Sequence, residues 1–550
     1  MYRESRKEQS NTRGFTLSET AWRAKEEVVR LLIERGANVN ERSSSNSDSD
    51  YRAGRYYDSP LIAACWGGRE SLVRDLIDHG ADVNMITSGG DYATPLIAAC
   101  WGGSLSVVKL LIDRGAKINM RAGTVGSALA EASLQGEPGM VGFLIDQGAV
   151  INMTLGDGVF GFALIAATYG ESVAVVEFLV AHGADVNLQA GSKYGSALIA
   201  AANGGSMEVV KILVARGADV NLQAGNEYGS ALIAAVYGES VEVVELLVAQ
   251  GADVNLQAGS KYGSALIAAV CGGSLAVVES LVARGADVNL QTGGDYGSAL
   301  SAAAQGMSDN QEHIMKHLID KGAILDMLLK TGPYGSALVS ACDQRHTHFC
   351  DLERVKLLVE NGADVNLELK TGDYGTALIA AAASGRTSFP ENGMPNILDY
   401  LIKQGARVNE QPAVGKFGSA LVAAAHCSHA EAVKLLIHRG ADVNLPLRTG
   451  DYVSALAAIA REQRDGHLLK RQRLALKHLI DTGADVDAVI QEGKYSLAFL
   501  EDLALFRSNS IEAFESDEES EGNGSEATMG KDEIGEEGTN KDADEEIGAR

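Results

Sequence analysis

The stretch GADVNLQAGSKYGSALIAA at residues 183–201 decides the fold, because the same nineteen residues return at 251–269. The two copies begin 68 residues apart, which is two periods of 34. The pattern Gly-Ala-x-[Val/Ile/Leu]-[Asn/Asp] occurs thirteen times along the chain, with its glycine at positions 36, 80, 115, 148, 183, 217, 251, 285, 322, 362, 405, 440 and 483. Self-similarity at a period of this length is typical of a solenoid of stacked units.

Each unit reads as two helices followed by a hairpin. In one central unit, the hydroxyl of Ser196 suits a helix N-cap, and the segment SALIAAANGG has apolar residues at helical spacing. After Gly204 and Gly205, the segment SMEVVKILVAR predicts a second helix, and Gly217 stands where a left-handed residue ends it. Two such helices cannot bury their own apolar faces, so the units must stack on one another. The sequence therefore predicts an all-α solenoid of about 12–13 units.

This repeat resembles the ankyrin repeat. The helix-opening Thr-Pro-Leu-His of that family survives as Ser-Pro-Leu-Ile at 59–62 and as Thr-Pro-Leu-Ile at 94–97, and the signature Gly-Ala-Asp-Val-Asn is intact in seven of the thirteen units. The unit here is 34 residues long against 33 in the family, and the additional residue lies in the hairpin. The resemblance covers roughly residues 14–505 and implies a non-enzymatic array that binds other proteins. The wording Tyr-Gly-Ser-Ala-Leu is also similar to the arrays attached to fungal NACHT-type signalling NTPases.

Irregular segments divide the chain further. We expect a disordered N-terminus (1–13), a degenerate first unit (14–40), a mobile loop (41–57), insertions near 343–351, 383–395 and 461–473, a closing helix (495–506) and a disordered acidic tail (507–550). The insertions fall between the two helices of their units, so they should project from one edge of the solenoid.

Charge and composition exclude several classes of partner. The net charge is −26, of which residues 511–550 carry −12, so we expect neither nucleic acid nor anionic lipid as a partner. The six cysteines form no Cys-x-x-Cys pair, which indicates reduced thiols, and no apolar stretch approaches the ~18 residues of a membrane span. We expect a soluble, monomeric, cytoplasmic protein, with the nucleus as an alternative location. Phosphate-binding and catalytic motifs are missing, so we expect no cofactor and no enzymatic activity.

One cluster has the residue types of a zinc site. The segment CDQRHTHFC places Cys342, His346, His348 and Cys350 within nine residues. The spacing matches no standard zinc pattern, and the alternative is a polar inserted loop flanked by two ordinary thiols. We treat these four residues as weak candidates.

A row of variable residues is the main candidate for partner binding. It lies seven residues after each helix-opening Ser or Thr, at the end of the first helix, and the residues around it keep the repeat pattern. In the ankyrin family the equivalent position faces the concave groove. The row begins with Trp66, Trp101, Leu134, Tyr169, Asn203 and Tyr237 and continues with Cys271, Gln305, Asp343, Ala383, His426 and Arg461. The two tryptophans are candidate hot spots, and the alternative is that they only pack on each other.

The hairpin tips supply a second row, whose charges alternate through the central units. Its central members are Lys193, Glu227, Lys261 and Asp295, and the others are Asp91, Pro333, Asp373, Lys416 and Asp451. Two interpretations stay open, namely attraction between neighbouring tips and selection of a partner. The tyrosine that follows each tip is too uniform to encode specificity, so we expect the tyrosines to form a structural stack.

These observations favour a non-enzymatic scaffold or adaptor that binds proteins along the groove. The alternative is a ligand-sensing arm or fragment of a NACHT-type signalling NTPase, and a zinc-binding module at Cys342–Cys350 is a third, weaker hypothesis.

Overall fold

The computed structural model describes eleven segments of the chain. These are residues 17–22, 26–41, 59–87, 93–155, 160–190, 193–224, 227–258, 262–343, 352–384, 397–461 and 470–492, together with Phe499 and Leu503. Within them the regular structure is helical, apart from one isolated bridge between Ala122 and Gly126. The segment 1–13, nearly all of the loop 41–57, the tail and most of the predicted closing helix lie outside the described residues.

The helices follow one another in pairs. The first helix of each pair is α1 (Leu17–Trp22), α3 (Pro60–Trp66), α5 (Pro95–Trp101), α7 (Ala128–Leu134), α9 (Ala163–Tyr169), α11 (Ala197–Asn203), α13 (Ala231–Tyr237), α15 (Ala265–Cys271), α17 (Ala299–Gln305), α19 (Ala337–Cys342), α21 (Ala377–Ser384), α23 (Ala420–His426) or α25 (Ala455–Arg461). The second is α2 (Glu26–Glu34), α4 (Glu70–Asp78), α6 (Leu105–Asp113), α8 (Pro138–Asp146), α10 (Val173–Ala181), α12 (Met207–Ala215), α14 (Val241–Ala249), α16 (Leu275–Ala283), α18 (Gln311–Asp320), α20 (Leu352–Glu360), α22 (Ile397–Lys403), α24 (Ala430–His438) or α26 (Lys470–Asp481).

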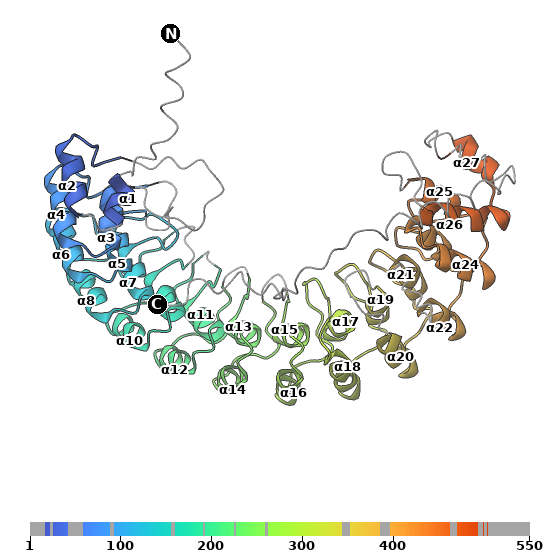
Figure 1. The fold of residues 1–550 in the computed structure, drawn as a ribbon. Helices are drawn as coiled ribbons and strands as arrows, with labels where there is room; N and C mark the ends of the chain where they lie inside the picture. The colour runs from blue at the N-terminus through green and yellow to red at the C-terminus, as the bar shows by residue number, and fades with distance from the viewer. Residues whose placement is uncertain are drawn as a thin grey trace, which may run out of the picture.

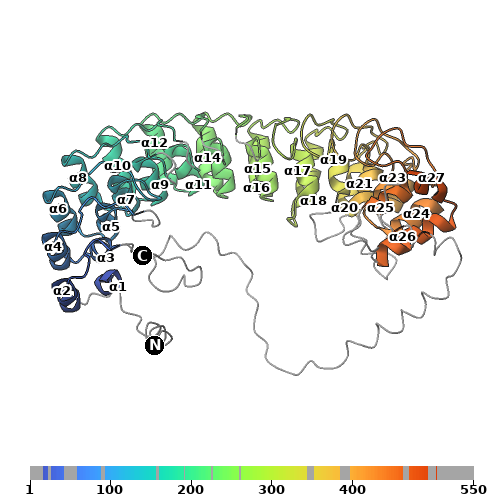
Figure 2. The ribbon, with the colours of Figure 1, turned by 90° about the horizontal axis from the view of Figure 1, so that it is seen from above.

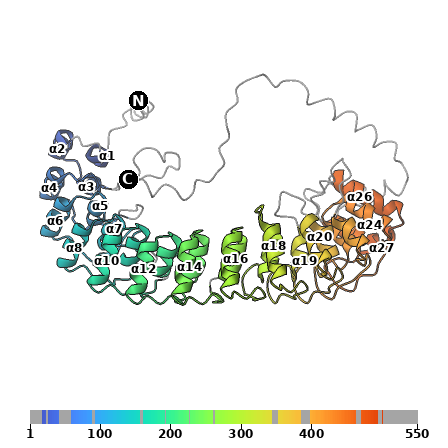
Figure 3. The ribbon, with the colours of Figure 1, turned by 90° about the horizontal axis from the view of Figure 1, so that it is seen from below.

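The pairs stack into a crescent, as predicted for an all-α solenoid. The odd-numbered helices line its concave side and the even-numbered helices its convex side (Figure 1). The loops that join successive units run along one edge of the array (Figures 2 and 3). We call the two sets the inner and the outer helices.

Local sequence signals explain where the helices begin and end. The Ser196 hydroxyl accepts a hydrogen bond from the Ile199 amide at 3.3 Å, which confirms the predicted N-cap of α11. Gly217 has φ +87° and ends the turn after α12, as its place in the pattern predicted. The inner helices are rich in alanine and almost fully buried, because each is packed between the inner helices of its neighbours.

The last unit departs from the repeat. After α26 we expected another extended hairpin, and the chain instead forms α27 (Val486–Glu492). The Asp485 carboxylate accepts a hydrogen bond from the Ala488 amide at 3.0 Å and so caps this helix. Phe499 and Leu503, from the predicted closing helix, are buried in the core.

A ladder of asparagines joins each unit to the next. The side-chain amide of Asn221 donates to the Gly251 carbonyl at 3.1 Å, and its oxygen accepts from the Asp253 amide at 2.7 Å. The same two bonds recur at Asn40, Asn84, Asn119, Asn152, Asn187, Asn255, Asn289, Asn366, Asn409 and Asn444. The last residue of the Gly-Ala-Asp-Val-Asn signature is thus an inter-unit clamp.

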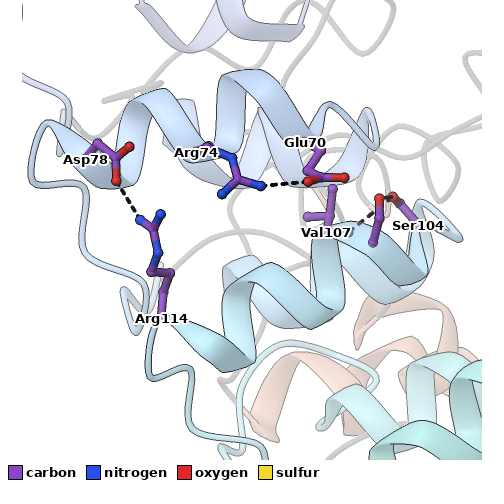
Figure 4. A network of polar contacts seen from close by, with 7 residues as sticks. Glu70, Arg74, Asp78, Ser104, Val107 and Arg114 are labelled. Atoms are coloured by element: carbon purple, nitrogen blue, oxygen red, sulfur yellow. Dashed lines mark hydrogen bonds and ion pairs between the residues drawn. The ribbon is translucent and has the colours of Figure 1, made fainter.

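Exposed ion pairs add a weaker connection on the convex side. Arg114 Nη1 lies 2.6 Å from Asp78 Oδ1 and links α6 to α4, while Arg74 and Glu70 pair within α4 at 2.8 Å (Figure 4). Because these side chains are exposed, each pair contributes about 1 kcal/mol at most. The alanine-rich stack and the asparagine clamps dominate the cohesion of the array.

From α3 to α15, close and open interfaces between adjacent units alternate. A Cβ built on Gly102, Gly170 or Gly238 would lie 2.2 Å from a backbone carbonyl oxygen of the preceding unit. At the equivalent Gly204 and Gly272 the nearest atom would be 3.6 Å away. The three close glycines are 68 residues apart, so the two-unit period of the sequence is also a period of the packing.

Hairpin tips in the second half of the array are joined by backbone hydrogen bonds. The Asp373 amide donates to the Pro333 carbonyl at 2.9 Å, the Lys416 amide to the Asp373 carbonyl at 2.8 Å, and the Asp451 amide to the Lys416 carbonyl at 2.8 Å. The tips of four successive units therefore form one hydrogen-bonded edge.

We expect the amides of Asp373, Lys416 and Asp451 to exchange with solvent at least about tenfold more slowly than unprotected amides, because exchange requires the edge to open. Hydrogen exchange measured by mass spectrometry on the full chain, with short peptides over each tip, checks this. Exchange at the intrinsic rate would show that the edge does not persist in solution.

Candidate functional site

The predicted row of variable residues lies on the inner helices. Each of its first members is the last residue of an inner helix. These are Trp66 of α3, Trp101 of α5, Leu134 of α7, Tyr169 of α9, Asn203 of α11 and Tyr237 of α13. We call these six residues the concave row. Because the inner helices line the concave side, the row follows the inside of the crescent (Figure 1).

Exposure along the concave row is uneven. Tyr169 is 37% exposed and Tyr237 46%, whereas the other four members are partly buried. Further along the chain the equivalent Asp343 and Ala383 are buried. Among the row residues whose exposure is described, the exposed large side chains, Tyr169 and Tyr237, therefore belong to the first half.

Tyr169 and Tyr237 do not stand alone, because each stacks on tyrosines of the hairpins. Ring centroids are 5.6 Å apart between Tyr169 and Tyr194, 6.1 Å between Tyr194 and Tyr228, 5.2 Å between Tyr228 and Tyr237, and 6.2 Å between Tyr237 and Tyr262. Tyr194, Tyr228 and Tyr262 are buried and Tyr194 stacks on Tyr228, which confirms the predicted structural stack between these two hairpins. The concave row and the row of hairpin tyrosines, which the sequence predicts as separate features, therefore meet. One sequence feature indicates this contact, namely a tyrosine of the concave row followed about 25 residues later by a hairpin tyrosine.

A second aromatic stack occupies the later units. Phe417 lies 6.2 Å from Tyr374 and 6.4 Å from Tyr452, centroid to centroid. The Tyr452 hydroxyl is 2.8 Å from Nδ1 of His426, and the Tyr374 hydroxyl donates to the Asp343 carboxylate at 2.8 Å. In these units the side chains at the row position are thus bound to the stack.

The charged hairpin tips lie close to their neighbours. Lys193 Nζ is 3.8 Å from Glu227 Oε2, and Lys416 Nζ is 2.8 Å from Asp373 Oδ2. Both distances support the interpretation that neighbouring tips attract one another. Asp295 is exposed, and Lys261 lies outside the described residues.

Only one of the four weak zinc candidates can be placed. Cys342 is buried at the end of α19, and burial raises the pKa of its thiol well above the ordinary value. A buried, protonated thiol is a poor metal ligand. His346, His348 and Cys350 lie outside the described residues, and the residues that are described contain no group of three potential ligands.

Membrane insertion finds no support either. Among the helices described above, none combines the length and the apolar character that a membrane span needs.

Comparison with known proteins agrees with the geometry. A family model for ankyrin repeats (3 copies) matches residues 17–122, 61–155, 129–224, 163–258, 198–292, 266–367 and 347–447. Among solved structures, the crystal structure of the human ASB11 ankyrin repeat domain is similar, with 28% sequence identity and a TM-score of 0.35, over 43% of this chain and 98% of that one. No curated protein matches the sequence. The narrower resemblance to NACHT-type arrays finds no support in these comparisons. Since the family matches together span residues 17–447, the chain belongs to the ankyrin-repeat family.

Proposed function

We propose that this ankyrin-repeat protein is a monomeric, non-enzymatic adaptor that binds partner proteins along the concave row. The observation that carries the proposal is the exposure of Tyr169 and Tyr237. They occupy a position where the packing of one repeat unit on the next requires no large side chain. The equivalent place in α21 is occupied by the buried Ala383, and in α11 by Asn203. Large aromatic residues that the fold does not need are typical hot spots of interfaces.

The aromatic stack prepares these two rings for binding. Contacts with Tyr194 and Tyr228 limit the rotation of Tyr169 and Tyr237, so a partner that binds them loses little additional side-chain entropy. Trp66 and Trp101 extend the row toward the N-terminal end of the crescent, and both are partly exposed. The buried free thiols of Cys65 and Cys100 fit the reducing cytoplasm that the composition favours.

The triple variant Trp66→Ala/Trp101→Ala/Tyr169→Ala is expected to lose at least about tenfold in affinity for a groove-bound partner, which corresponds to about 1.4 kcal/mol. Partners are captured from host lysate with the wild-type protein, and the dissociation constant of each recovered protein is then measured for both forms. Circular dichroism establishes that the variant is folded.

A matched control removes two aromatic rings from the convex side. Phe143 and Phe178 are partly buried residues of the outer helices α8 and α10. The variant Phe143→Ala/Phe178→Ala should retain the partner. Equal binding by the triple variant and the wild type would contradict the assignment of the concave row and leave the fold intact.

A further inference from the structure

A short motif on the concave row recurs with the two-unit period. The motif Tyr169-Gly170-Glu171 begins at the last residue of α9. The same motif, Tyr237-Gly238-Glu239, begins at the last residue of α13, 68 residues further on. In both copies the tyrosine is exposed and the glycine touches the preceding unit. The unit between them carries Asn203-Gly204-Gly205 instead.

The two glutamates occupy a backbone conformation that disfavours them. Glu171 has φ 53° and Glu239 has φ 55°, in the left-handed region. In five other units the equivalent residue is glycine, with φ between 63° and 71°, and in one it is Ser428, with φ 60°. A side chain in this region is strained, and glycine would form the same turn without strain. The turn itself does not require a glutamate, and what the two residues add is an exposed carboxylate two residues after an exposed tyrosine.

The turns around the two motifs contain acidic and no basic residues, whereas the hairpin Lys193 lies 5.7 Å from the ring of Tyr194, which contacts Tyr169. The five turns at residues 133–139, 168–174, 202–208, 236–242 and 270–276 contain no lysine, arginine or histidine. Their acidic residues are Glu137, Glu171, Glu208, Glu239 and Glu242, and all five are exposed. The carboxylate of Glu171 reaches over the next turn, because its Oε1 lies 3.8 Å from the place of a Cβ on Gly204.

Between the two motifs lies an unpaired hydrogen-bond acceptor. The side-chain oxygen of Asn203 is buried and has no hydrogen-bond partner among the described residues. Such an acceptor is unfavourable in a folded protein unless a donor reaches it. A bound segment that carries N–H donors would supply one once the amide turns toward the groove.

We propose that the pairs Tyr169/Glu171 and Tyr237/Glu239 each bind one cationic side chain of a basic segment of a partner protein. The proposal rests on the function proposed above and adds the chemistry of the partner. A tyrosine face attracts an arginine or lysine through the ring quadrupole, and the adjacent carboxylate supplies the opposite charge. The acidic tail of this chain is excluded as the occupant, because its net charge of −12 has the same sign as the surface.

The spacing of the pairs specifies the partner further. Aromatic contacts limit the distance between the two pairs, because centroid separations of 5.6, 6.1 and 5.2 Å lead from Tyr169 through Tyr194 and Tyr228 to Tyr237, which places Tyr169 and Tyr237 at most about 17 Å apart. An extended segment rises about 3.3 Å per residue and directs every second side chain to the same face, so its two cationic residues should lie about four residues apart.

The test uses the full chain and labelled peptides of twelve residues. One peptide carries arginine at its third and seventh positions in a neutral Gly/Ser background, and a second has the same composition with the two arginines adjacent. Binding is measured by fluorescence anisotropy in 50 mM salt. We expect the spaced peptide to bind at least about fivefold more tightly than the adjacent one, and to weaken severalfold in 300 mM salt.

Three variants separate charge from strain. Glu171→Gln/Glu239→Gln should weaken the spaced peptide at least about fivefold. The control Glu177→Gln/Glu245→Gln, which removes the same charge from the outer helices α10 and α14, should change it less than twofold. Glu171→Gly/Glu239→Gly should lose the same binding and unfold at a higher urea concentration than the wild type, since the strain is removed.

Several results would overturn the proposal. They are failure of the spaced peptide to bind at 1 mM, equal binding of both peptides, equal losses in the Gln and control variants, or a lower unfolding midpoint for the Gly variant. If any of these results is obtained while the triple variant of the concave row still loses its partner, the proposal of a basic partner segment is wrong and the proposed adaptor function is unaffected.

Discussion

Replacing Gly238 by alanine is expected to destabilise the array by about 3 kcal/mol, the largest effect we predict for a single methyl group. The new Cβ would lie 2.2 Å from the Asn203 carbonyl oxygen and 3.0 Å from its carbon, and both are backbone atoms of the preceding unit. Backbone cannot rotate away as a side chain can, so α11 and α13 must separate. The midpoint of the first transition in urea unfolding measures the loss.

The chain contains its own control for this substitution. Gly272 occupies the same place after α15, has a φ of −70° against −75° at Gly238, and would place a Cβ 3.6 Å from its nearest neighbour. Gly272→Ala should leave stability unchanged or raise it by about 0.5 kcal/mol. After α7 the equivalent residue is Gln135, which shows that the interface between the unit of α7 and the preceding unit accommodates a side chain at this position. Similar losses at Gly238 and Gly272 would contradict the alternation of close and open interfaces.

Replacing Asn221 by alanine should cost about 2 kcal/mol. The variant removes both inter-unit hydrogen bonds, to the Gly251 carbonyl and from the Asp253 amide, and each such bond contributes roughly 1 kcal/mol net. Because stability in a solenoid is a sum over units and their interfaces, the array should open first at this interface. Hydrogen exchange around residues 217–221 and 251–255 locates the opening.

Asn221→Asp is the control for Asn221→Ala, and another unit of the array carries aspartate at the equivalent position. Asp326 replaces the asparagine in one unit, where its carboxylate still accepts from the Asp364 amide at 2.9 Å. A carboxylate has no donor for the glycine carbonyl, so Asn221→Asp should lose about half as much as Asn221→Ala. If both variants match the wild type, water replaces the clamp at no cost and the ladder contributes nothing to stability.

These two predictions describe a stiff frame behind the proposed binding surface. The glycine contacts fix how closely inner helices approach, and the asparagine clamps fix how consecutive hairpins are joined. The spacing between Tyr169 and Tyr237 depends on both. A partner that binds at two positions of the concave row requires such a frame, because the distance between the two positions would vary in a loosely packed array.

The sequence by itself determined the unit. The recurrence of one string, the serine caps, and the glycines after the outer helices predicted helix pairs whose ends lie at the predicted residues, as at Ser196 and Gly217. These features arise from contacts within a few residues of each other, so the local pattern contains the information needed to place them. The position of the concave row followed in the same way, because each member ends a helix.

Only the tertiary structure decided how the units meet. Gly238 and Gly272 follow their helices in the same way, yet one touches the preceding backbone and the other does not. The contact of Tyr169 with Tyr194 and the hydrogen bonds of Asn221 to backbone groups likewise join residues some 25 to 32 positions apart. Such contacts depend on the distance and rotation between neighbouring units, which the sum of their packing fixes and no single unit specifies.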